Sequence, residues 1–196
     1  MSDWASIAEL MTAWGRHRDA GRWDRLADLF APDAFLDLAW FHGSADDFVA
    51  SCRRRASGRS LRSKHVIASP LITVLGDRAL AETDAQLLTD QLDLDLGAVT
   101  HIRFLDCLVR LGDSWRIAYR ASIYDLCAFT SPTGRFDVDA DAAGQFPREY
   151  AGLAYILSRS GYPVTAESPT RGGPLEDDIQ RAEAEWLHGG PLPGMR

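Results

Sequence analysis

The stretch MTAWGRHRDAGRWDRLADLF, residues 11–30, holds the end of one predicted helix and the start of a second. Four apolar residues recur at helical spacing before that end: Trp4, Ile7, Met11 and Trp14. Asp19 falls on the edge of the apolar stripe that they form, and Gly21 is the residue type that commonly ends a helix. The Asp19 carboxylate is therefore either a solvated surface acid, which the stretch alone favours, or a group at the rim of a pocket beside Trp14 and Trp23.

Length, composition and charge indicate a globular chain that does not bind polyanions. The 196 residues suit one domain with some extra length or two very small domains, and 46% apolar with 25% charged residues predicts a packed core. A net charge of −7 without a basic run argues against nucleic acid or an anionic membrane surface as a partner. No apolar run approaches the roughly 20 residues of a membrane span, and the acidic N-terminus does not resemble a signal peptide.

Known metal, nucleophile and nucleotide motifs are missing from the sequence. Cys52, Cys107 and Cys127 are an odd number without metal-ligand spacing, so we interpret them as buried free thiols in a reducing, cytoplasmic compartment. HxxEH, HExxH and CxxC do not occur, so no metal site is predicted. The lack of a GxSxG elbow, a Walker loop and a GxGxxG after a strand gives no support to serine nucleophiles or nucleotide cofactors. Among the kinds of catalysis considered, acid–base chemistry by a carboxylate and an imidazole remains as the candidate.

The first part of the chain is predicted to be mainly helical. Periodicity and turn residues predict helices at 3–18 and 22–30, a turn at 31–33, a strand at 34–41, a helix from 45 to about 55 and a polar loop at 56–63. Ser44 is the expected N-cap of the third helix. The run from Arg53 to Arg55 falls at the end of that helix, where the helix dipole favours cations.

From Lys64 onward the pattern changes to period two, which is typical of strands. Strands are predicted at residues 65–75, with a bend at Pro70, and at 79–92, 99–111 and 115–124. The Gly-Asp pairs at 76–77 and 112–113 are hairpin signals. Long strands joined by tight turns form an antiparallel meander. Helices followed by a meander indicate an α+β fold, with the helices packed on one face of a curved sheet.

The tail after residue 130 is predicted to be a C-terminal extension of a domain spanning 1–130. An irregular excursion is expected at 130–148, with helices at 147–159 and 175–187 and an extended segment at 162–174 between them. The extension, residues 131–196, has too much apolar surface for a disordered linker and is too small to bury that surface alone. We therefore expect it to pack on the domain or on a neighbouring subunit.

Two histidines, His65 and His101, lie in strands whose neighbours are largely apolar. A single histidine in such a strand is more often a core residue with its hydrogen bonds satisfied than a catalyst. The residues alone therefore favour the structural interpretation for both.

The order and spacing of these features resemble the SnoaL-like branch of the NTF2-like superfamily. Three segments carry the resemblance: RWDRLADLFAPDAFLD (22–37), KHVIASPLITVLGDRALAET (64–83) and HIRFLDCLVRLGDSWRIAYR (101–120). The resemblance covers roughly residues 3–127 and implies a cone-shaped α+β barrel, in which a curved antiparallel sheet wraps round N-terminal helices and encloses an apolar pocket. Relatives in this branch include scytalone dehydratase, hexachlorocyclohexane dehydrochlorinase, bile-acid dehydratases and polyketide cyclases.

The resemblance also implies a catalytic pair. Lyases of this branch use an aspartate at the end of the first helix and a histidine at the start of the strand after the third helix, which correspond to Asp19 and His65. An imidazole can take a proton from carbon when a carboxylate on its other ring nitrogen fixes the tautomer and stabilises the imidazolium. Such chemistry requires neither a metal nor an organic cofactor.

Other positions are expected at the pocket, and one departs from the family pattern. Trp14 stands where the dehydratases often have a tyrosine, so the acid for a leaving group is either Tyr124 or His101, or none is needed. Arg120 either binds a polar group of the substrate or, slightly favoured, pairs with Asp106 to hold adjacent strands. The candidates for pocket lining, which could equally fill core, are Trp40, Phe104 and Phe129.

Two functions follow from the sequence. The first is a cofactor-independent lyase, of dehydratase or dehydrohalogenase type, or an isomerase, acting on a small hydrophobic cyclic substrate. The second is a non-catalytic ligand-binding or assembly subunit with the same fold. The resemblance further implies a homodimer or homotrimer.

Overall fold

The computed structural model describes residues 2–58, 60–162, 164 and 167–194. The helices are α1 (Asp3–Asp19), α2 (Trp23–Ala27), α3 (Ala45–Ala56), α4 (Ala140–Ala143), α5 (Ala151–Arg159) and α6 (Pro174–Leu187), with a short 3-10 helix, η1 (Leu92–Leu94). The strands are β1 (Phe30–Leu38), β2 (Phe41–Ser44), β3 (Leu61–Ile67), β4 (Leu71–Leu75), β5 (Arg78–Gln91), β6 (Leu96–Leu111) and β7 (Ser114–Thr130). The loop expected at 56–63 and the extended segment expected at 162–174 include residues 59, 163, 165 and 166, which lie outside the described residues.

The strands form one curved sheet in the order β2-β1-β7-β6-β5-β3, and β4 also pairs with β5. Strands β5, β6 and β7 form the predicted antiparallel meander, which confirms the α+β class. The sheet stays open at β2 and β3, so the cone is not a closed barrel. Strand β1 runs parallel to β7, a pairing that the meander prediction lacked. None of the helices in the described part of the chain has the length and apolar character needed to cross a membrane.

The prediction for residues 22–41 is wrong in detail. Helix α2 ends at Ala27, and Phe30 already pairs with Ile117 as the first residue of β1. The Ile117 N–H also donates to the Leu29 carbonyl at 2.9 Å, so this segment pairs with β7 instead of continuing as a helix. The expected turn around Pro32 is a register irregularity inside β1, where the missing proline N–H is tolerated.

The strand predicted at residues 65–75 is two strands that lie end to end along β5. Strand β3 pairs from Leu61 to Ile67, and β4 pairs from Leu71 to Leu75. The break contains Pro70, which has no N–H to continue the ladder. Strand β3 begins inside the predicted loop, because β5 is long enough to pair with both segments.

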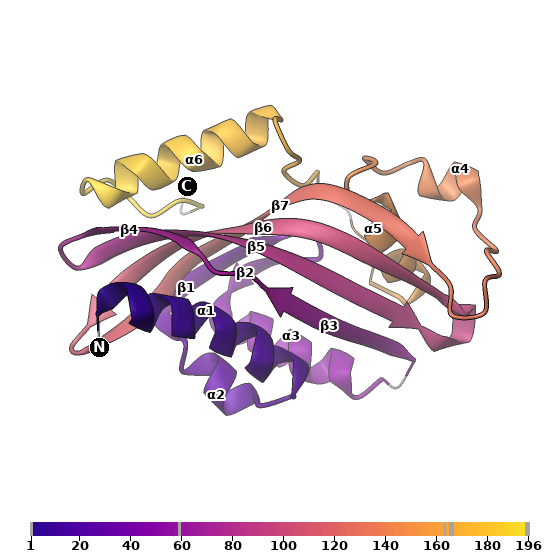
Figure 1. Ribbon diagram of the computed structural model, residues 1–196, viewed down its shortest axis with the longest axis horizontal. Coiled ribbons are helices and arrows are strands. Elements are labelled where there is room, and N and C mark those ends of the chain that lie inside the picture. Colours follow the sequence, from indigo (N-terminus) through magenta and orange to yellow (C-terminus); the bar gives the residue numbers. More distant parts are fainter. Residues whose placement is uncertain (1, 59, 163, 165–166, 195–196) are drawn as a thin grey trace.

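Figure 1 shows helices α1, α2 and α3 on one face of the sheet and α6 across the opposite face, with α5 at one end of the sheet. Both faces of the central strands are therefore covered, which explains why residues 117–124 of β7 are all buried. Helix α6 contributes Trp186 and Leu187 to a separate apolar cluster on its side of the sheet. Cys52 and Cys107 are buried free thiols as predicted, whereas Cys127 is only partly buried.

Candidate active site

The end of α1 brings Asp19 to the unpaired side of β3. Gly21, with φ of +64°, closes the helix, and the N–H of Arg22 donates to the carbonyl of His17 at 2.9 Å. This is the Schellman arrangement, in which glycine takes a left-handed conformation at low cost. Further up the helix, a Cβ added at Gly15 would lie 2.7 Å from Cγ1 of Ile67. A glycine inside the helix therefore lets α1 approach β3 closely.

Asp19 and His65 form a short hydrogen-bonded pair. Nδ1 of His65 lies 2.6 Å from Oδ1 of Asp19, and the backbone N–H of His65 donates to Oδ2 at 2.8 Å. Nζ of Lys64 also donates to Oδ2 at 2.8 Å. These donors offset the unfavourable position of a carboxylate at the negative end of a helix dipole. The side chains of the pair are 10% and 8% exposed, while Lys64 is 62% exposed, so the pair is shielded and the lysine is its outer partner.

The ionisation of the pair suits a general base. Burial alone would raise the pKa of Asp19, but hydrogen bonds and charge from His65 and Lys64 outweigh it and bring that pKa to about 2. Burial lowers the pKa of His65, and Asp19 only partly opposes this. At neutral pH Asp19 is therefore a carboxylate and His65 a neutral imidazole. Since Nδ1 donates its proton to Asp19, the lone pair stays on Nε2.

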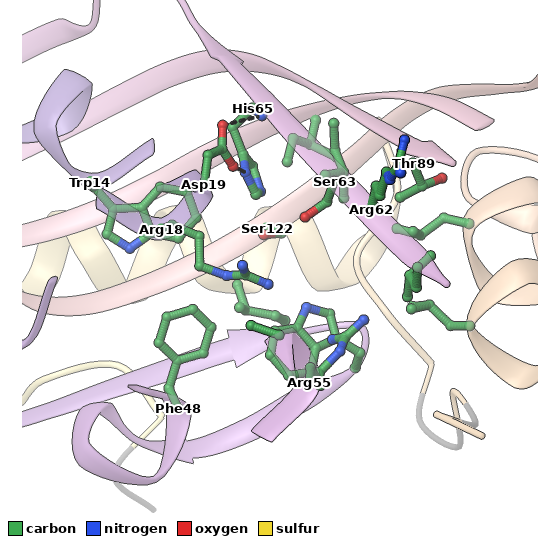
Figure 2. Close-up of a pocket in the computed structure, with 18 of the residues that line it drawn as sticks. Trp14, Arg18, Asp19, Phe48, Arg55, Arg62, Ser63, His65, Thr89 and Ser122 are labelled. Atoms are coloured by element: carbon green, nitrogen blue, oxygen red, sulfur yellow. Dashed lines mark hydrogen bonds and ion pairs between the residues drawn. The ribbon is translucent and has the colours of Figure 1, made fainter. Parts of the chain in front are cut away.

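The pair forms part of the wall of a cavity of about 450 Å³, within the size range of small-molecule sites. Figure 2 shows the His65 ring and the Arg18 side chain reaching into this space. Aromatic residues supply much of the lining: Trp14, Trp23, Trp40, Phe48, Phe104 and Tyr124. Leu153 and Leu157 of α5 also line the cavity, so the C-terminal extension contributes directly to it.

The structure brings together most of the residues predicted at the pocket. Asp19, His65, Trp14, Trp40, Phe104 and Tyr124 all line the cavity. The Trp14 ring meets the His65 ring edge-on, with centroids 5.2 Å apart, and so packs against the imidazole. The Tyr124 hydroxyl accepts from the Ala39 N–H at 3.2 Å, and burial raises the pKa of Tyr124 to about 12.

Arg120 does not reach the cavity wall. It is 1% exposed and donates to Asp106 from Nε at 2.7 Å and from Nη2 at 2.9 Å, the strand-holding pair that the sequence slightly favoured. Its guanidinium lies 4.3 Å from the Trp14 ring centroid and 4.2 Å from that of Phe104. Arg120 therefore supports two wall residues from behind.

His101 and Phe129 are also outside the cavity lining. His101 alternates along β6 with Ile102 and Phe104, which both line the cavity, so it belongs to the other face of the strand. Phe129 packs against Tyr155 of α5, with ring centroids 5.7 Å apart.

Two cavity residues, Arg18 and Arg55, were missed as site residues by the sequence analysis. The arginine run ending at Arg55 was interpreted through the helix dipole alone. Helical spacing was the available signal, because Arg55 follows Phe48 and Cys52 at seven and three residues and shares their buried face. In the described residues, no three His, Cys, Asp or Glu side chains gather in an arrangement that could hold a metal ion.

Comparisons with known proteins agree with this architecture. A family model for the SnoaL-like domain matches residues 1–121. No curated protein sequence matches the chain significantly. Solved structures with the same fold include a protein from Novosphingobium aromaticivorans assigned as a scytalone dehydratase, with 16% identity and a TM-score of 0.57, covering 68% of this chain and 94% of the other.

Two further structures share the fold. A hexachlorocyclohexane dehydrochlorinase has 13% identity and a TM-score of 0.57, covering 69% of this chain and 92% of its own. A protein of unknown function from Mycobacterium tuberculosis has 16% identity and a TM-score of 0.54. Its match covers 84% of this chain and 92% of the other, so it extends over more of this chain than the two enzyme matches do.

Proposed function

The chain belongs to the SnoaL-like domain family, and on that premise we propose that it is a cofactor-independent lyase or isomerase. Its substrate is a small hydrophobic cyclic molecule that loses water or halide, or shifts a double bond, after a proton leaves carbon. The observation that carries the proposal is the 2.6 Å contact between Asp19 and His65 on the wall of an open cavity.

His65 acts as the base in this mechanism. Its Nε2 takes the proton from a substrate carbon, and Asp19 stabilises the imidazolium through Nδ1. A positioned general base contributes about 10²–10⁴-fold to rate. Because both side chains are largely withdrawn from water, the ion pair that forms in the transition state is stabilised more strongly than it would be in solvent.

Tyr124 is the proposed acid for a leaving hydroxyl. Its raised pKa keeps it protonated at neutral pH, and its hydroxyl lies at the cavity wall beside the Ala39 N–H and the Ser122 side chain, so it is the phenol that can protonate a leaving group. His101, the other candidate from the sequence, lies on the opposite strand face and is not proposed for this role.

Two steps test the proposal. A panel of terpenoid, steroid and aromatic polyketide compounds is first screened for thermal stabilisation, because a ligand of the folded state raises the melting temperature. Each binding compound is then incubated with enzyme in D₂O, and NMR measures turnover, either as deuterium incorporation at carbon or as formation of the alkene when water or halide leaves. We expect turnover with the wild type, and its loss in His65→Ala and Asp19→Asn. His101→Ala is the matched control and retains turnover; normal turnover in His65→Ala would refute the base assignment.

The alternative is a non-catalytic ligand-binding or assembly subunit. The hydrogen-bonded Asp19–His65 pair on the wall of the cavity supports the enzyme, since a ligand-binding subunit needs a cavity but not a buried acid–base pair. Compounds that bind tightly but undergo neither exchange nor elimination with the wild type would favour the non-catalytic subunit.

A further inference from the structure

The cavity contains two guanidinium groups that the Asp19–His65 pair does not use. Arg18 comes from the last turn of α1, directly before Asp19, and Arg55 from the last turn of α3. Both side chains line the cavity whose wall includes His65. In Figure 2 the Arg18 side chain extends into the space between the helix and Arg55.

Neither arginine has a carboxylate partner among the described residues, whereas three other shielded arginines of this protein do. Arg103 contacts Glu82, Asp125 and Glu176 at 2.7–3.1 Å. Arg110 contacts two carboxylates, and the buried Arg120 is held by one through two hydrogen bonds. Half-buried Arg78 and Arg116 have no carboxylate either, but each donates to a backbone carbonyl. In the described part of the chain, neither kind of acceptor is found for the two guanidiniums in the cavity.

Arg55 is held in position by aromatic rings. Its Cζ lies 4.0 Å from the Trp40 ring centroid and 4.4 Å from that of Tyr162. Ring contacts satisfy the faces of a guanidinium but leave the N–H groups at its edge without acceptors. Nη1 of Arg55 is buried and has no hydrogen-bond partner among the described residues. The structure therefore holds a rigid donor that lacks an acceptor.

The charges of the two arginines also oppose each other. Burial and the positive charge of Arg18 lower the pKa of Arg55 to about 10. The charge of Arg18 also disfavours protonation of His65. An anion between the guanidiniums would remove the repulsion and satisfy the buried donor at once. The protein as a whole carries a net charge of −7, so the attraction for an anion is local to this cavity.

We infer that the cavity binds a cyclic or aromatic carboxylate. Arg18 and Arg55 donate hydrogen bonds to the acid group, and the ring lies against the aromatic wall. A carboxylate matches the planar, two-pronged edge of a guanidinium. The catalytic consequence rests on the proposed function: the acid group anchors the substrate, and a ring carbon is presented to Nε2 of His65. The binding claim concerns the two arginines alone.

Matched acid and amide probes test this binding claim. Benzoate and 2-naphthoate, with benzamide and 2-naphthamide, are titrated by calorimetry into the wild type, Arg18→Met, Arg55→Met and Arg53→Met. Arg53 is the control, because it lies on the same helix turn but outside the cavity and pairs with Asp24 at 3.1 Å. Circular dichroism and melting temperature establish that each variant is folded, and Arg18→Met gives an independent arm should Arg55→Met unfold.

We expect at least one acid to bind the wild type roughly tenfold more tightly than its amide, as a charge-assisted contact implies. Arg18→Met and Arg55→Met lose this preference, and Arg53→Met keeps it. Equal affinity for acid and amide, no binding of either acid, or an equal loss in Arg53→Met would overturn the inference. His65→Ala separates the two proposals, because it abolishes turnover yet retains the preference for the acid. If the wild type shows the preference but neither deuterium exchange nor elimination, the proposed function fails and the carboxylate site stands.

Discussion

Replacing Asp19 by asparagine should lower the stability of the protein in a pH-dependent way. The ordinary pKa of an aspartate is 3.8 and that of Asp19 is about 2, so folding favours its carboxylate over its acid form by roughly 2 kcal/mol. Three donors converge on the two carboxylate oxygens: Nδ1 and the N–H of His65, and Nζ of Lys64. An asparagine presents an NH₂ group to one of them, so it cannot accept all three.

The sign of the pH dependence follows from the lowered pKa. A group whose pKa falls on folding contributes stability above its unfolded pKa and loses it as pH falls through the folded value. At pH 7 we expect Asp19→Asn to unfold with a free energy roughly 2 kcal/mol lower than the wild type. The difference should shrink between about pH 4 and pH 2 as the wild-type carboxylate takes up its proton.

Urea denaturation followed by tryptophan fluorescence, repeated across that pH range, measures both quantities. Asp24→Asn is a suitable control, because Asp24 is an almost fully exposed carboxylate. Equal stability of Asp19→Asn and the wild type at pH 7 would show that the Asp19 carboxylate does not stabilise the folded protein. A gap that does not narrow toward pH 2 would show that the lost stability comes from packing and not from the ionised group.

Two further substitutions probe the stability of the fold. Glu183 is buried, and its Oε1 has no hydrogen-bond partner among the described residues. Burial raises the pKa of Glu183, so the folded protein favours the protonated acid. The free energy of unfolding therefore falls as pH rises above about 4.5, the ordinary pKa of a glutamate. Glu183→Gln should therefore stabilise the protein at pH 7 by roughly 1–3 kcal/mol, and a benefit that persists unchanged at pH 4 in urea denaturation would contradict this. Replacing glycine by alanine inside a helix usually raises the free energy of unfolding by about 1 kcal/mol. Gly15→Ala should give no such increase, because the new Cβ would lie 2.7 Å from Ile67. A raised melting temperature would show that α1 can move away from β3 without cost.

Local sequence patterns correctly predicted those parts of the fold that depend on a single segment or on two segments adjacent in the chain. Gly21 ends α1 as expected, and the period-two segments after Lys64 form the predicted meander. The parallel pairing of β1 with β7 was not predictable in this way. It joins Phe30 to Ile117 across most of the domain, and the Pro-Asp pair inside β1 is typical of a turn.

The site was predictable only in part, for related reasons. Asp19 and His65 are 46 residues apart, so their meeting was inferred from the family resemblance and not from local spacing. His101 was predicted at the cavity with the other site residues, whereas strand alternation places it on the other face from Ile102 and Phe104, outside the lining. Arg55 was missed because a run of arginines at a helix end is normally solvated, and only tertiary packing shows that its last member is enclosed.

The ionisation state of His65 shows whether a neutral imidazole is available as the base, and its measurement needs no substrate. Nitrogen-15 NMR of the histidine ring distinguishes a protonated nitrogen from one that carries a lone pair. We predict that at pH 7 His65 is neutral, with its proton on Nδ1 facing Asp19 and the lone pair on Nε2, and that Asp19→Asn weakens this preference. A ring that is doubly protonated at pH 7, or that carries its proton on Nε2, would contradict the account.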